Sequence, residues 1–119
     1  MIDIRSALVD RAEGVASRNP DLVVRYSIYT DDVSEWGILS ILNEDERVVG
    51  LEFIETDDSW KRPGAVKDYT NAAAEGYPVA VVVPDESFMA FRRSAIERGG
   101  TGFSTYLFSD LGLRTMIRA

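Results

Sequence analysis

The sequence predicts a single α/β domain over residues 1–119, in which helices flank both faces of a mixed sheet. Three observations lead to this prediction: the expected elements follow the order αβββαβαβ, one strand is apolar on both faces, and no repeat or linker divides the chain. Strands joined by short polar turns pair antiparallel, whereas a strand–helix–strand unit implies a parallel, right-handed crossover. The length is sufficient to bury a core without disulfides.

The first half of the chain predicts one helix followed by three strands. Ile4, Leu8, Ala12 and Val15 recur at helical spacing and form one apolar stripe, which ends before Pro20. After it, β-branched and aromatic residues alternate with polar ones, and short polar turns separate the runs. This pattern predicts an antiparallel meander of three strands at residues 22–29, 36–42 and 47–55.

The second half predicts alternating helices and strands. A helix begins at Ala65 and ends before Gly76, and a second opens at Asp85 or Glu86 and stops at Gly99. The expected strands and the short closing helix cover residues 78–83, 103–108 and 111–117. Strand 78–83 is apolar on both faces, as in a central parallel strand, so we expect it to pair parallel with the third meander strand.

The expected core contains apolar residues of the first helix, of the first four strands and of the helix after Asp85. Its members are Leu8, Val24, Ile28, Leu39, Ile41, Leu51, Phe53, Val81, Val83 and Phe91. On the helix after Asp85, we also expect Phe88, Met89, Ala95 and Ile96 on the packed side.

Composition excludes several classes of chemistry. The chain has no cysteine and no histidine, which excludes thiol nucleophiles, Ser-His-Asp triads and structural zinc sites. Catalysis would have to use carboxylates, lysine, tyrosine, hydroxyls or an oxygen-bound metal such as magnesium. The formal net charge is −7, with −9 in residues 1–60 and +2 in residues 61–119. This acidic surplus disfavours nucleic acid as a partner.

No segment predicts membrane insertion. The longest unbroken apolar run covers residues 79–83, far below the roughly 20 residues that cross a bilayer. The N-terminus lacks the basic and apolar regions of a secretory signal, although a processed chain would look the same. We therefore expect a cytoplasmic protein.

Glu52 is the first candidate for chemistry. Side chains two apart on a strand share a face, so Glu52 lies with Gly50 and Ile54, while Glu55 points the other way. A carboxylate on a central strand needs a metal, a cation or hydrogen bonds, because burying it alone costs several kcal/mol. Solvent at the end of the sheet, or an arginine such as Arg25 on a neighbouring strand, would also satisfy it.

The order of elements resembles the PD-(D/E)xK nuclease superfamily, which includes archaeal Holliday-junction resolvases and many restriction nucleases. The closest part is residues 48–56, followed by a helix and by residues 79–84. The resemblance implies a restriction-endonuclease-like fold with an αβββαβ core. It also implies an acid at the start of the second strand and an (E/D)-x-K triplet in the third.

The catalytic motif departs from that family pattern. If Glu52 is the family glutamate, Ile54 stands where the lysine should be, and Trp36 or Gly37 stands near the position of the first acid. Lys67, on the following helix, could replace the lysine. In an active enzyme, Glu52 and Lys67 would then be catalytic, and carboxylates would hold the Mg²⁺ that activates water. The candidate metal ligands are Glu13, Asp32, Glu35 and Glu52.

These departures favour a catalytically degenerate nuclease-like domain that needs no cofactor and acts as a protein-interaction or regulatory module. One alternative is an active Mg-dependent nuclease with a rearranged site, and another is an unrelated α/β domain that binds a small ligand. The expected partner is a protein. We expect Trp36 in the core, and we expect Trp60, Lys61 and Arg62, in an acidic loop, to contact the partner.

Overall fold

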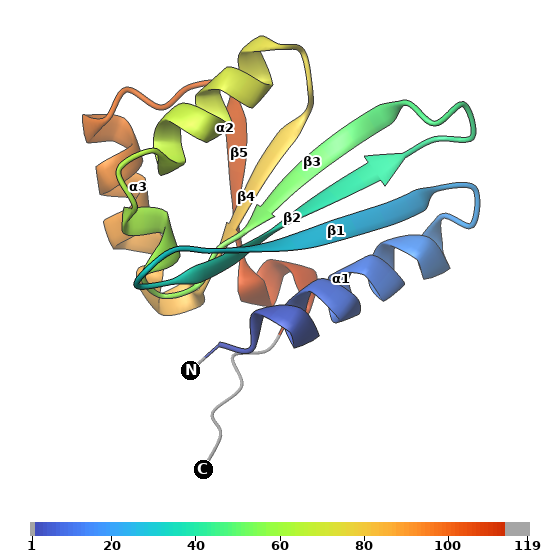
Figure 1. The fold of residues 1–119 in the computed structure, drawn as a ribbon, viewed down its shortest axis with the longest axis horizontal. Coiled ribbons are helices and arrows are strands. Elements are labelled where there is room, and N and C mark those ends of the chain that lie inside the picture. Colours follow the sequence, from blue (N-terminus) through green and yellow to red (C-terminus); the bar gives the residue numbers. More distant parts are fainter. Residues whose placement is uncertain (1, 114–119) are drawn as a thin grey trace.

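A computed structural model describes residues 2–113 as a five-stranded mixed sheet between helices (Figure 1). The elements are α1 (Ile4–Arg18), β1 (Val23–Thr30), β2 (Glu35–Leu42), β3 (Val48–Ile54), α2 (Ala65–Ala74), β4 (Val79–Val83), α3 (Phe88–Glu97) and β5 (Phe103–Leu107). Two 3-10 turns lie between them, η1 (Ser59–Lys61) and η2 (Asp85–Ser87), and a third, η3 (Phe108–Leu111), follows β5. The α/β class is therefore confirmed. The helix expected at 111–117 lies mostly outside the described residues, and Leu111 ends η3.

The strands follow one another across the sheet in the order β1-β2-β3-β4-β5. The first three form the expected antiparallel meander, with Val24 opposite Ile41 and Gly37 opposite Ile54. Strand β4 pairs parallel with β3, and β5 pairs parallel with β4. Short turns force the antiparallel pairs, and the crossovers that contain α2 and α3 produce the parallel ones.

Helix α1 packs on one face of the sheet. Its N-cap is Asp3, whose side chain accepts a hydrogen bond from the Ser6 amide. Leu8 lies directly over Gly37 of β2, where an added Cβ atom would be 2.5 Å from a Leu8 methyl carbon. Glycine at this position therefore lets the helix approach the sheet closely.

Helices α2 and α3 pack on the opposite face. The rings of Phe53 and Tyr69 meet edge to face at 4.8 Å between centroids, and Trp60 meets Phe91 in the same way at 5.8 Å. Helix α3 contributes Phe91 and Ala95 to the core, and Phe88 packs against it. The neighbouring positions on the helix surface face solvent. The placement of Met89 and Ile96 on the packed side was wrong, since both are 71% exposed.

The expected core set divides according to the position of each strand. Leu8, Leu39, Phe53, Val81, Val83 and Phe91 are buried, whereas Val24, Ile28, Ile41 and Leu51 are half-buried. Val24 and Ile28 lie on β1, which is at the edge of the sheet, so part of each side chain meets solvent. Within residues 2–113, no helix is long and apolar enough to span a membrane.

Candidate functional site

Glu52 forms a buried ion pair with Arg11 of α1. The carboxylate is on β3, faces α1 and is only 7% exposed. Arg11 donates from Nε to Oε1 at 2.7 Å and from Nη2 to Oε2 at 2.8 Å, a bidentate arrangement. The hydrogen bond to Glu52 raises the pKa of Arg11 against the opposing effect of burial. Both carboxylate oxygens are therefore bound to a permanent cation.

The prediction that Glu52 needs a compensating group is confirmed, but Arg25 is not that group. The Arg25 guanidinium is mostly exposed and lies 4.0 Å from Glu46. Arg11 was missed because it is 41 residues from Glu52 in the sequence. A signal existed: Arg11 is three residues after Leu8 and four before Val15, so it lies on the apolar stripe of α1.

The structure does not bring the four candidate metal ligands together. Glu13 lies on the exposed side of α1, Asp32 lies in the β1–β2 turn, and Glu35 begins β2 with an exposed side chain. Over residues 2–113, no group of three or more acidic, histidine or cysteine residues is placed to hold a metal ion. The rearranged magnesium site that would combine these acids with Glu52 is therefore not formed in this part of the chain.

Lys67 and Glu52 lie on opposite sides of the sheet. Lys67 is on the exposed side of α2, which covers the face opposite α1, whereas Glu52 faces α1. Lys67 instead lines a surface cavity of about 340 Å³ together with Arg98. The sheet separates the two nominated catalytic residues because α2 follows β3 through a crossover on the other face.

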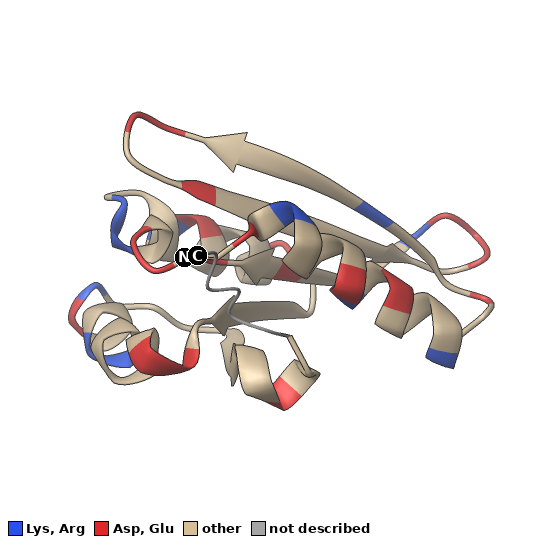
Figure 2. Ribbon diagram, turned by 90° about the horizontal axis from the view of Figure 1, so that it is seen from below, with Lys and Arg blue, Asp and Glu red and all other residues tan. Residues whose placement is uncertain are grey.

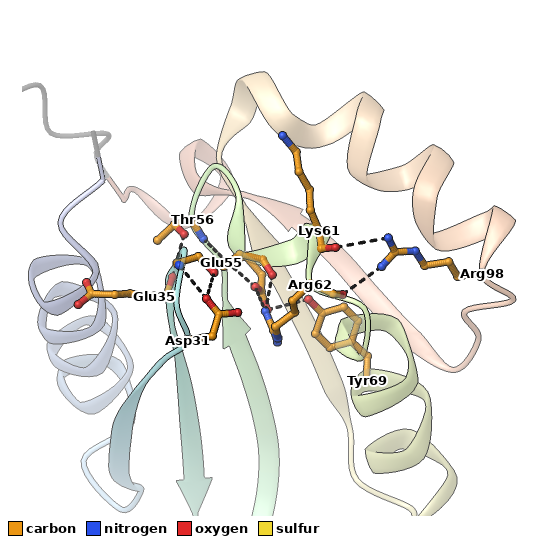
Figure 3. Close-up of polar contacts among 10 residues, drawn as sticks. Asp31, Glu35, Glu55, Thr56, Lys61, Arg62, Tyr69 and Arg98 are labelled. Carbon is orange, nitrogen blue, oxygen red and sulfur yellow. Dashed lines mark hydrogen bonds and ion pairs between the residues drawn. The ribbon is translucent and has the colours of Figure 1, made fainter.

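A second buried carboxylate, Glu55, follows the last residue of β3 and is fully buried. It points toward α2 and accepts hydrogen bonds from Ser59 Oγ at 2.6 Å, Arg62 Nη1 at 2.6 Å and Tyr69 Oη at 2.6 Å (Figure 3). Its backbone amide donates to the Val82 carbonyl oxygen. This network anchors the β3–α2 loop to the sheet and satisfies a charge that would be costly to bury alone.

Arg62 links this network to an aromatic pair. Its side chain is 8% exposed, and its guanidinium carbon lies 3.8 Å from the centroid of the Trp36 ring. Burial opposes the positive charge, but the hydrogen bond and the charge of Glu55 raise the pKa of Arg62 overall. Trp36 in turn stacks on Tyr29 of β1, with 6.1 Å between centroids and 18° between planes.

The three residues nominated for partner contact have different surroundings. Trp60 is 5% exposed and belongs to the core. Lys61 is exposed and pairs with Asp58 at 2.9 Å, and only 8% of the Arg62 side chain is exposed. The expectation for the two tryptophans was wrong: Trp60 lies in the core, and Trp36, which was expected there, is half-buried at the surface. The turn η1 rotates Trp60 inward against Phe91, and sequence periodicity does not report the direction of a side chain in such a turn.

Tyr69 should keep its proton in alkaline solution. Burial, followed by the nearby charge of Glu55, raises the pKa of the phenol far above its ordinary value. Its contribution to stability is complete below the unfolded pKa of about 10 and is lost as the pH rises further. The absorbance of ionised tyrosine in the native protein and in Tyr69→Phe should therefore rise in parallel until the protein unfolds. An extra ionisation in the native protein before unfolding would contradict this placement.

A cavity of about 290 Å³ opens beside the Arg11–Glu52 pair, on the same face of β3, β4 and β5. Glu52, Ser104 and Tyr106 contribute polar groups, and Gly50 and Ala80 leave space because their side chains are small. A small ligand could occupy this cavity. The alternative that the chain is an α/β domain that binds a small ligand stays a prediction.

Comparisons of the chain with protein-family models, curated proteins and solved structures gave no match. The geometry of the two buried carboxylates therefore carries the functional argument. Each carboxylate is bound by an arginine, and neither lies in a group that could hold a metal within residues 2–113.

Proposed function

We propose that this chain is a nuclease-like domain without a working catalytic site, which acts as a protein-interaction or regulatory module. The observation that carries the proposal is the bidentate Arg11–Glu52 pair. Glu52 is the acid that the family resemblance assigns to the metal site, and a guanidinium occupies both of its oxygens. Magnesium prefers free carboxylate oxygens and would have to compete with this cation.

Two further features support the proposal. Ile54, which stands at the position of the family lysine, is 0% exposed and has no group that could orient water. The helix, the antiparallel meander and the parallel β4 also follow the αβββαβ order that the resemblance implies. A restriction-endonuclease-like fold is therefore part of the same proposal.

The charge distribution favours a protein partner over nucleic acid. The net charge is −7, and Figure 2 shows acidic residues along α1 and in the turns beside β1 and β2. These charges would repel a polyphosphate chain. Several exposed apolar side chains, among them Tyr29 and Val33, provide contact area of the kind that protein partners use.

The protein should not cleave single-stranded or double-stranded DNA with magnesium or manganese, and should bind DNA at most weakly and in a salt-sensitive way. Gel-based cleavage assays over a range of metal concentrations test this. Glu52→Ala and Lys67→Ala are the diagnostic variants, with circular dichroism as the control for folding. Cleavage that disappears in both folded variants would overturn the proposal, whereas cleavage unchanged in both would identify a contaminating nuclease.

A further inference from the structure

Strand β1 leaves one long edge of the sheet open. It is the first strand in the sheet order, at one edge, so no strand within residues 2–113 pairs with its outer side. It covers the eight residues Val23–Thr30 and pairs with β2 without a bulge, and Arg25 is its single charged residue. Edge strands are usually protected by charges, proline or bulges. An open edge with so little protection is typical of a strand that pairs with another chain.

The faces of β1 carry apolar contact area that is already fixed in position. Val23, Tyr26 and Tyr29 are 49%, 38% and 44% exposed. Tyr29 stacks on Trp36, and Trp36 is held by the guanidinium of Arg62. Glu55 fixes Arg62 in turn, so the aromatic pair loses little freedom when a partner binds. Rigid tyrosine and tryptophan side chains commonly dominate binding energy at protein interfaces.

Carboxylates flank this edge at both ends. Exposed Asp21 precedes β1, and exposed Asp31 and Asp32 follow it. Glu35 begins the neighbouring strand, and the turn at residues 44–46 adds three more acids near the Asp21 end, of which Glu46 lies 4.0 Å from Arg25. The Asp31 carboxylate is held in place by the amides of Val33 and Ser34. Figure 2 shows acidic residues in the turns at both ends of β1.

We propose that the β1 edge binds an extended segment of another protein that has alternating apolar residues in its centre and lysine or arginine toward both ends. The segment would extend the sheet through main-chain hydrogen bonds, while its basic ends would meet the flanking carboxylates. This inference rests on the proposed interaction function and specifies the partner. A second copy of the chain does not fit, because pairing β1 with β1 in either direction places acids against acids.

Two synthetic peptides of about ten residues, a length that matches one strand, test the proposal. Both have alternating valine and threonine in the centre; one has lysines at both ends and the other has glutamates. The lysine peptide should shift the amide NMR signals of residues 23–30 and bind more weakly as salt is added. The glutamate peptide should not bind.

Matched charge variants locate the surface. Asp32→Lys with Glu35→Lys reverses two exposed acids beside β1, and Glu75→Lys with Glu97→Lys makes the same change in net charge just after α2 and at the end of α3. We expect the first pair to weaken binding of the lysine peptide by at least about tenfold and the second pair by less than about threefold. Tyr29→Ser should also weaken binding, because it removes half of the aromatic stack.

Three results would overturn the docking surface: no binding of the lysine peptide, equal binding of both peptides, or equal weakening by both charge pairs. None of these results would affect the proposed loss of nuclease function, which the cleavage assays test separately. The two proposals can therefore fail separately.

Discussion

Replacement of Glu55 by alanine is expected to lower the free energy of unfolding by about 3 to 5 kcal/mol, because it leaves the buried guanidinium of Arg62 without its anion. The same change removes the acceptor of the Tyr69 hydroxyl and of Ser59 Oγ. Each buried donor left unpaired adds to the cost. Urea denaturation monitored by circular dichroism measures the change.

Two further variants define the origin of this loss. Glu55→Gln keeps the shape and an acceptor oxygen but removes the charge, so its effect should fall between those of wild type and Glu55→Ala. Glu75→Ala, at an exposed carboxylate beside α2, should change stability by less than about 0.5 kcal/mol. A loss below about 1 kcal/mol in Glu55→Ala would show that the network contributes little to the fold.

Phe53→Ala should also cost about 3 to 5 kcal/mol, through lost burial and the cavity that remains. The Phe53 side chain is at the centre of the sheet on β3, is 5% exposed, and meets the Tyr69 ring at 4.8 Å. Surrounding strands and α2 limit how far the site can collapse. Thermal and urea denaturation should agree on the loss.

Val33→Ala is the matched control for Phe53→Ala, because Val33 is apolar but 85% exposed in the β1–β2 turn. Its effect should stay within about 0.5 kcal/mol. If Phe53→Ala were equally mild, with a change below about 1 kcal/mol, the packing around β3 would differ from the structure described.

The sequence by itself determined the order of the elements and the direction in which the strands pair. Local signals carry this information: the stripe that begins at Ile4 sets α1, and short polar turns close the meander. The apolar run at residues 79–83 marks a strand buried on both faces. These signals act over a few residues, so they can be read without knowing the rest of the fold.

The sequence also showed that Glu52 needs a partner and that Glu55 faces the other way. It did not show that Glu55 is the more deeply buried of the two. The 7% exposure of Glu52 and the full burial of Glu55 depend on how closely α1 and the β3–α2 loop cover each face.

Only the tertiary structure decided which groups meet. Arg11 binds Glu52, which is 41 residues away in the sequence. Glu55 accepts hydrogen bonds from Arg62 and Tyr69 because the loop after β3 folds back over the end of that strand. The same loop carries Trp60 into the core, whereas Trp36, on β2, is half-buried. Such contacts depend on the rotation of a helix or a turn about its own axis. Packing sets that rotation, and a pattern along the chain does not specify it.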